Sequence, residues 1–215
     1  TLSTSTVVLG LCDSSPKEDL NRGKVWLGIE TRSGEEIIAR YERVALLPCN
    51  GDSPGHNDEI PGPTVPVSLD SWGSLVPDWD LNSLPETSWS VGEEREDPLS
   101  DHVDLAPALA RFTFNQAAIH RDSEASSFGK RLVYGGHTQG LAQASLTRLL
   151  PGLVTVLGWD GCDHLGPVFE GDQLSFHHTL KEVLPLNEGR ILRFEIRASR
   201  EGEDVLLWTP IVVAP

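Results

Sequence analysis

The stretch Leu132–Leu146, LVYGGHTQGLAQASL, decides the fold. It opens with two glycines and a histidine and continues with the spacing of a helix. One side of that helix is narrow and built from small or apolar residues: Leu141, Ala142, Ser145, Leu146 and Leu149. Because small residues let a helix lie close against a sheet, we expect a buried helix from just after Gly136 to Pro151-Gly152.

A shorter helix is predicted upstream of this stretch. Asp104 is placed to cap it, and Pro107 falls near its first turn. Leu105, Leu109 and Phe112 recur at helical spacing. We therefore expect these three side chains to share one face of the helix.

Antiparallel strands are predicted at both ends of the chain. Residues 1–48 alternate as three strands around the turn at Gly34, and residues 172–215 do the same around Gly202. Gly23 matches Gly189 in this alignment. The two blocks therefore indicate an internal duplication, although two antiparallel meanders can also simply look alike.

Three parts are predicted along the chain. Residues 1–48 are the closing strands of a first repeat, residues 49–103 are a linker and an irregular crossing, and residues 104–215 are the second repeat. The acidic run 92–101, GEEREDPLSD, is predicted to be solvated surface. Three tryptophans are expected to anchor the crossing on the sheet: Trp72, Trp79 and Trp89.

Composition narrows the function classes. The 215 residues are 39% hydrophobic, enough for one large domain or two small ones. A net charge of −15 repels nucleic acids and anionic lipid surfaces, so we expect neither as a partner. The sequence has no apolar run of about 18 residues and only three cysteines without CxxC spacing. A cytoplasmic protein with reduced cysteines is the expectation.

Two apparent motifs are rejected. Gly51–Gly55, GDSPG, fits the nucleophile elbow of serine hydrolases, but Pro54 lacks the N–H that the elbow uses to bind an oxyanion. No HExxH motif or cysteine pair is present, so no metal site is expected. Two groups of possible metal ligands are set aside on that ground: His120 with Asp122, and Asp160 and Asp163 with His164.

A candidate catalytic group lies at the start of the central helix. Asn115 and His120 are five positions apart, and Gly135-Gly136 follows them. Paired glycines allow close approach of a ligand to the backbone, and the N–H groups at a helix N-terminus favour negative charge. An imidazole nearby can move a proton while an amide holds a water molecule.

These residues resemble the motif of the MaoC-like hydratase/dehydratases, which have the hotdog fold. Asn115, His120, Asp122 and Gly135-Gly136 fall on the motif positions. The sequence that follows resembles the double-hotdog subgroup that includes mesaconyl-CoA hydratase. The resemblance implies an α+β fold in which an antiparallel sheet wraps a central helix. It also implies two such repeats, the N-terminal one incomplete in this chain.

The resemblance further implies an acyl-CoA hydratase/dehydratase, a lyase that adds water reversibly across the C2=C3 bond of a 2-enoyl-CoA. His120 would be the acid/base, and Asn115 would position the water. The Gly136 N–H would bind the thioester oxygen. Further substrate contacts are expected at Tyr134, Gly135, His137, Lys130 and Arg131, the last two for the CoA phosphates.

Three features of this interpretation remain open at the sequence level. Many family members carry Asp at the position of Asn115, so His120 would carry proton transfer nearly alone. A hotdog thioesterase and a non-catalytic acyl-CoA-binding subunit are the alternatives. Apart from the CoA of the substrate no cofactor is expected, and either a homo-oligomer or a pseudo-dimer of the two repeats is predicted.

Overall fold

The computed structural model describes residues 1–17, 20–62 and 65–215. The chain divides into two compact units, Thr1–Pro63 and Thr64–Pro215. The predicted three-part division at residues 48 and 103 remains a prediction. Within the described residues, no helix combines the length and the apolar character needed to cross a bilayer.

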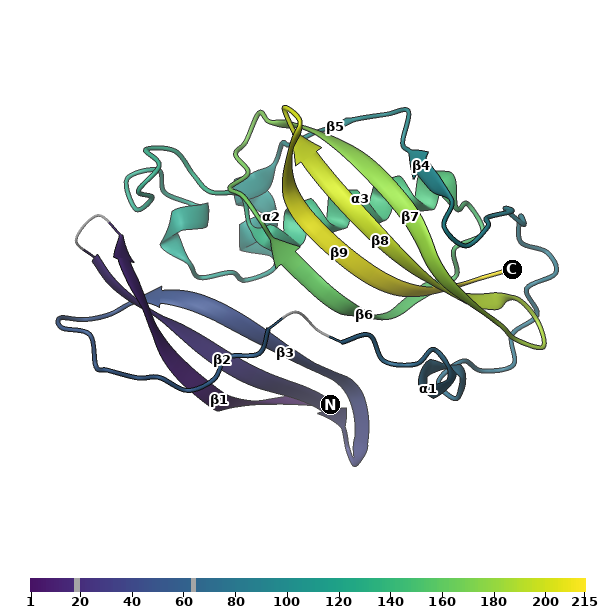
Figure 1. The fold of residues 1–215 in the computed structure, drawn as a ribbon, viewed down its shortest axis with the longest axis horizontal. Coiled ribbons are helices and arrows are strands. Elements are labelled where there is room, and N and C mark those ends of the chain that lie inside the picture. The colour runs from purple at the N-terminus through teal and green to yellow at the C-terminus, as the bar shows by residue number, and fades with distance from the viewer. Residues whose placement is uncertain (18–19, 63–64) are drawn as a thin grey trace. The chain divides into compact units, whose positions relative to one another are not determined.

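The first unit is the predicted three-stranded meander. Strands β1 (Leu2–Lys17), β2 (Leu20–Ser33) and β3 (Glu36–Pro48) pair antiparallel in that order (Figure 1). Gly34 turns β2 into β3 with a φ of +62°. Part of the expected linker also lies on this sheet, because the Asp58 N–H donates to the Leu11 carbonyl over 2.9 Å.

The second unit contains a larger antiparallel sheet in the order β4-β7-β8-β9-β6, with β5 pairing β7. Its strands are β4 (Glu94–Glu96), β5 (Asp101–His102), β6 (Thr155–His164), β7 (Gln173–Pro185), β8 (Arg190–Arg200) and β9 (Glu203–Ala214). Gly202 turns β8 into β9 with a φ of +84°, as Gly34 does in the first unit. The match of Gly23 to Gly189 is wrong, since Gly23 lies inside β2 whereas Gly189 precedes β8 with a φ of +76°.

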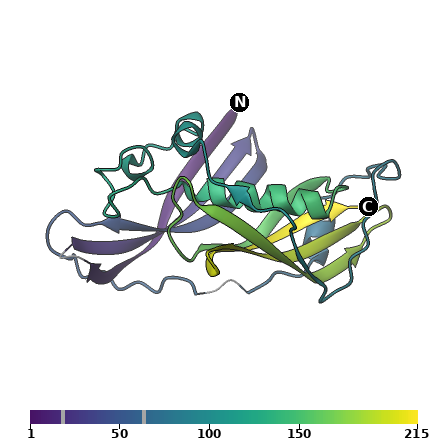
Figure 2. The ribbon, with the colours of Figure 1, turned by 90° about the horizontal axis from the view of Figure 1, so that it is seen from above.

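Helix α3 (Gly135–Leu149) lies along one face of this sheet (Figures 1 and 2). It begins two residues earlier than predicted, at Gly135 instead of His137. Ala142, Ser145 and Leu146 are buried, which confirms the centre of the expected stripe. Ala142 and Leu146 pack into a core that includes Phe176, Phe194 and Trp208.

The opposite face of the sheet is covered by the segment around α1 (Asp70–Gly73). Leu69 and Leu81 form a second core with residues of β8 and β9. The Trp72 ring lies against Gly158, where an added Cβ would be 2.6 Å from the ring. Trp72 and Trp89 therefore act as predicted, but Trp79 is 37% exposed and its expected anchoring is wrong.

The shorter helix, α2 (Ala106–Phe112), departs from the prediction. Leu105, not Asp104, is its N-cap residue, and no side chain caps it. The apolar residues at helical spacing do not mark the buried face, because Leu105 and Phe112 are 70% and 82% exposed. The helix buries Ala106 and Ala110 instead, whose small side chains allow a closer approach to the domain.

Candidate active site

The loop after α2 fixes Asn115 through main-chain bonds. The Phe114 N–H donates to the Arg111 carbonyl over 3.1 Å, and the Asn115 N–H donates to the Ala110 carbonyl over 2.9 Å. This pair of bonds is a Schellman motif, which requires a left-handed residue. That residue is Phe114, with a φ of +54°.

The side chain of Asn115 also bonds within its own loop. Its Oδ1 atom accepts a hydrogen bond from the Ala117 N–H over 3.0 Å. The amide is therefore oriented before any ligand arrives. Since an amide oxygen has two lone pairs, it can still accept one hydrogen bond from a water molecule.

His120 is the last residue of the short 3₁₀ helix η1 (Ala118–His120). Its Nδ1 atom lies 2.8 Å from the Leu132 carbonyl oxygen. A carbonyl only accepts, so Nδ1 carries the proton and Nε2 holds the lone pair in the neutral ring. The Leu132 N–H donates back to the Ile119 carbonyl over 3.1 Å, which ties η1 to the segment before α3.

That segment leads directly into the N-terminus of α3. Tyr134 is the N-cap residue, and its ring lies 5.8 Å from the His120 ring between centroids. The Tyr134 side chain makes no capping hydrogen bond. The first N–H groups of a helix have no partner within the helix, so this end of α3 can receive an anion or a developing oxyanion.

The two glycines at this end are each covered by an aromatic ring. A Cβ added to Gly136 would lie 2.8 Å from the ring and 2.9 Å from the hydroxyl oxygen of Tyr134. A Cβ added to Gly135 would lie 2.5 Å from Nε2 of His164, the last residue of β6. The glycines thus serve to admit these two rings, a role the sequence did not reveal.

His137 lies in the same first turn of α3. Its Nδ1 atom is buried and has no hydrogen-bond partner among the described residues. Burial lowers the pKa of His137, although the carboxylates of Asp104 and Glu170 pull it upwards. A neutral imidazole at the edge of the site follows from this balance.

Lys130 and Arg131 have partners in the loop after β6. The Lys130 ammonium lies 4.2 Å from the centroid of the Phe169 ring. Arg131 forms an ion pair with Glu170 at 2.5 Å. The Arg131 side chain is 39% exposed and the Glu170 side chain is 33% exposed. Exposed ion pairs are worth little, so a phosphate could compete with Glu170 for Arg131.

The structure also contains a buried polar cluster that sequence reasoning missed. Ser145 donates to Asp97 over 2.6 Å, and His178 Nε2 lies 2.8 Å from the Ser145 oxygen. Arg148 donates to Asp97 over 2.8 Å and to Asp101 over 2.7 Å. The Ser145 hydroxyl donates its hydrogen bond to Asp97, so His178 Nε2 must donate a hydrogen bond to the Ser145 oxygen. In a catalytic triad the serine instead donates to the histidine, so this arrangement does not activate Ser145 as a nucleophile.

This polar cluster corrects one expectation. Asp97 was expected in a solvated acidic run, but it is 5% exposed. On β7, His178 is fully buried, whereas the side chain of its neighbour His177 is 41% exposed. Burial lowers the pKa of His178 to about 4, against the opposing pull of Asp97. The sequence signal for this cluster was Arg148, which lies one helical turn after Ser145 on a helix predicted to be buried and therefore needs an acidic partner.

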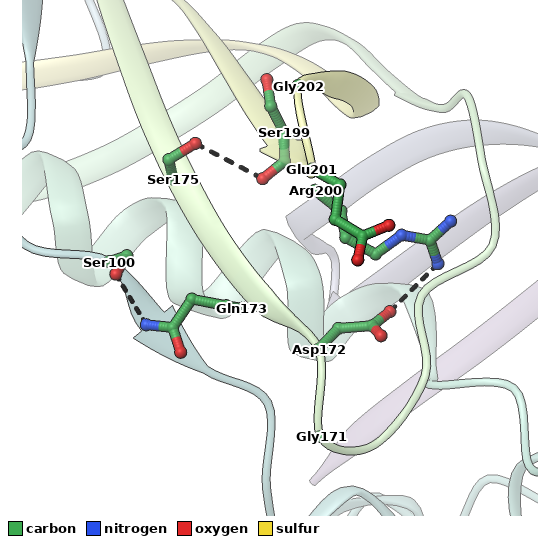
Figure 3. A pocket seen from close by; sticks show the side chains of 9 residues that line it. All are labelled: Ser100, Gly171, Asp172, Gln173, Ser175, Ser199, Arg200, Glu201 and Gly202. Atoms are coloured by element: carbon green, nitrogen blue, oxygen red, sulfur yellow. Dashed lines mark hydrogen bonds and ion pairs between the residues drawn. The ribbon is translucent and has the colours of Figure 1, made fainter.

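A cavity of about 540 Å³ lies elsewhere in the second unit (Figure 3). It is polar and open, and none of the predicted site residues lines it. Its arginine, Arg200, is engaged by Asp172 at 3.1 Å and by the Pro167 carbonyl at 2.8 Å. The cavity walls come from three regions: Ser100, residues 171–173 with Ser175, and residues 199–202. Since its cation is already paired, this cavity does not compete with the start of α3 as a catalytic site.

Relatives of this chain were found by sequence and by structure, although no family model matches it. Mesaconyl-CoA hydratase of Cereibacter sphaeroides is 26% identical over 95% of the chain, which spans 63% of that relative's length. A conserved hypothetical protein of Mycobacterium tuberculosis with a double hotdog fold is 33% identical. That match has a TM-score of 0.78 and covers 99% of this chain and 69% of the other.

This chain belongs to the double-hotdog family. A MaoC-domain protein of Chloroflexus aurantiacus, described as a dehydratase, shares the fold at a TM-score of 0.76 and 19% identity. The match covers all of this chain and 70% of the other. These comparisons confirm the expected α+β double-hotdog fold. The roles of the individual site residues remain predictions.

Proposed function

We propose that this MaoC-like protein is an acyl-CoA hydratase/dehydratase that adds water reversibly across the C2=C3 bond of a 2-enoyl-CoA. The observation that carries the proposal is the hydrogen bond from His120 Nδ1 to the Leu132 carbonyl. It leaves Nε2 as a base next to the uncapped start of α3. The named activity of the Cereibacter sphaeroides relative supports the same chemistry.

In the hydration direction, His120 Nε2 accepts a proton from a water molecule held by the Asn115 amide. The water oxygen bonds to C3, and the electron pair of the double bond moves through C2 towards the thioester oxygen. The Gly136 N–H donates to that oxygen as its charge develops. A preorganised donor of this kind is typically worth about 3–4 kcal/mol in the transition state.

The remaining predicted residues have supporting roles in this proposal. Tyr134 and His137 shape the pocket mouth, and Gly135 would contact the thioester through its main chain. Lys130 and Arg131 would contact the CoA phosphates. No cofactor is needed beyond the CoA of the substrate. Mesaconyl-CoA is a candidate substrate, and pairing of two hotdog repeats in the cytoplasm is the setting we propose.

Hydration of crotonyl-CoA and mesaconyl-CoA tests the proposal, followed by the loss of absorbance of the conjugated thioester. We expect His120→Gln to lower kcat by about 10²–10⁴-fold, because proton transfer contributes that much. His102→Gln, an exposed histidine in β5, is the matched control and should leave the rate unchanged. Full activity of His120→Gln would exclude the mechanism.

A second candidate is a non-catalytic acyl-CoA-binding protein, favoured by one observation. Asn115 has no titratable proton, and its amide oxygen already accepts a bond from Ala117. This alternative predicts binding of acyl-CoA in calorimetry with no turnover. Release of free CoA thiol would instead identify a thioesterase.

A further inference from the structure

His164 approaches the candidate site from a different element than His120 does. It is the last residue of β6, and it pairs with Leu206 of β9 in the sheet. Its imidazole occupies the space beside the first residue of α3. A Cβ on Gly135 would lie 2.5 Å from Nε2, 2.7 Å from Cε1 and 3.0 Å from Cδ2 of that ring.

The two imidazoles lie along the same helix end. His120 is linked to Gly136 through the Tyr134 ring, which is 5.8 Å from His120 and covers that glycine. His164 covers the neighbouring Gly135. A thioester bound at the Gly136 N–H would therefore lie beside the Tyr134 ring, which His120 contacts, and beside the His164 ring on the adjacent Gly135.

Hydration of an enoyl thioester requires two proton transfers. One proton leaves the attacking water, and another must arrive at C2. Asn115 can supply neither, because an amide does not titrate near neutral pH. His178 is enclosed in the polar cluster with Asp97 and Ser145, and the Nδ1 atom of His137 is buried. Of the imidazoles considered, His164 is the exposed one that lies against the start of α3.

We propose that His164 is the general acid that delivers the proton to C2, an inference that rests on the proposed hydratase function. His120 takes one proton from water as the oxygen bonds to C3, and the enolate electron pair at C2 takes one proton from His164. The product gains one hydroxyl group and one hydrogen. His120 then releases its proton to solvent, and His164 regains one from solvent, so both rings return to their starting states.

The pH dependence of kcat separates this role from a structural one. A base that must be neutral and an acid that must be protonated give a bell-shaped profile. We expect His164→Gln to lower kcat about 10²-fold and to remove the alkaline limb while keeping the acidic limb. The control His102→Gln should keep the whole bell. An unchanged profile in active His164→Gln would overturn the inference and leave the hydratase function standing.

Gly135→Ala provides an independent test, because the three atoms nearest to its new Cβ all belong to the His164 ring, which would have to move away. It should reproduce the loss of the alkaline limb and leave the melting temperature within a few degrees. In the His164→Gln background the same change should add less than about threefold, as expected for two changes that act through one interaction. Fully multiplicative losses would refute the coupling. A wild-type protein that hydrates no enoyl-CoA would overturn both the function and this inference.

Discussion

The two three-stranded meanders, β1–β3 and β7–β9, have the same strand order, and each makes its last turn at a glycine with positive φ. They differ in burial. Twelve of the thirteen residues of β3 are exposed, whereas β9 is buried along most of its length. The alternating sequence pattern is enough to form strands in both places. Burial depends on what packs against them, which in the second unit is α3 on one face and the α1 segment on the other.

The exposed strand of the first meander, β3, therefore relies on contacts within its own sheet. Glu30 on β2 pairs with Arg32 at 2.6 Å and with Arg40 of β3 at 2.5 Å. Its apolar side chains remain accessible, with Tyr41 46% exposed and Leu47 50% exposed. We expect the two sheets to respond very differently to removal of a large side chain.

The largest expected difference is between Phe194→Ala in β8 and Tyr41→Ala in β3. Phe194 is fully buried and packs edge-on against Trp89 at 5.1 Å, so its loss should cost about 3–5 kcal/mol. Tyr41→Ala should cost less than about 1 kcal/mol. Urea unfolding, with hydrogen exchange to resolve the two sheets, measures both. Equal costs would show that the first sheet has a core of its own.

Acid should weaken the second unit through His178. Its pKa is about 4 in the folded chain because it is buried, while an unfolded histidine titrates near 6.5. The unfolded state therefore binds the proton first as the pH falls. The free energy of unfolding should drop by about 3 kcal/mol between pH 6.5 and 4 and then lose nothing more from this group.

His178→Gln should remove that pH dependence, whereas His177→Gln, whose side chain is 41% exposed, should retain it. Asp97 adds a loss at lower pH. Burial alone would raise its pKa, but hydrogen bonds from Arg148 and Ser145 lower it overall. Its stabilisation is present above the ordinary pKa of Asp and disappears as the pH falls through the lowered value. A wild-type protein equally stable at pH 6.5 and 4 would contradict the assignment.

Much of the fold was predictable because it depends on local patterns. Strand alternation, the glycine turns at Gly34 and Gly202 and the small-residue stripe of α3 all appear where the sequence places them. Which face of α2 is buried could not be predicted from the sequence. Leucine and phenylalanine at helical spacing indicate a buried face, but the backbone entering the helix is left-handed at Leu105 and turns the alanines inward.

The candidate site was predictable only in part. The motif from Asn115 to Gly136 named the residues, and the structure brings His120 to Tyr134 and the start of α3. The rings that cover the two glycines could not be read from spacing, since His164 is 29 residues after Gly135 and reaches it through the sheet. Asp97 was missed for the same reason.

The two turn glycines, Gly34 and Gly202, should show a smaller stability effect that is similar in both units. Gly34→Ala and Gly202→Ala should each cost about 1 kcal/mol, because an L-residue is strained in the left-handed region. Nothing lies within 4 Å of either added Cβ, so no packing term is expected. Urea midpoints of each variant measure the effect. A much larger cost at Gly202 would mean that the surrounding core, rather than the turn, determines the strain.

Relief of the same left-handed backbone strain predicts a gain in stability when Phe114 is replaced by glycine. This residue adopts a φ of +54° at the end of α2, where helices usually have glycine, and it is 82% exposed. Phe114→Gly relieves about 1–2 kcal/mol of left-handed strain and adds about 0.5–1 kcal/mol of backbone entropy to the unfolded chain. A net stabilisation of up to about 1 kcal/mol should appear as a higher urea midpoint. Phe112→Ala, equally exposed but at the end of the regular helix, should show no such gain. Destabilisation by Phe114→Gly would mean that the ring makes contacts that outweigh the strain of its backbone.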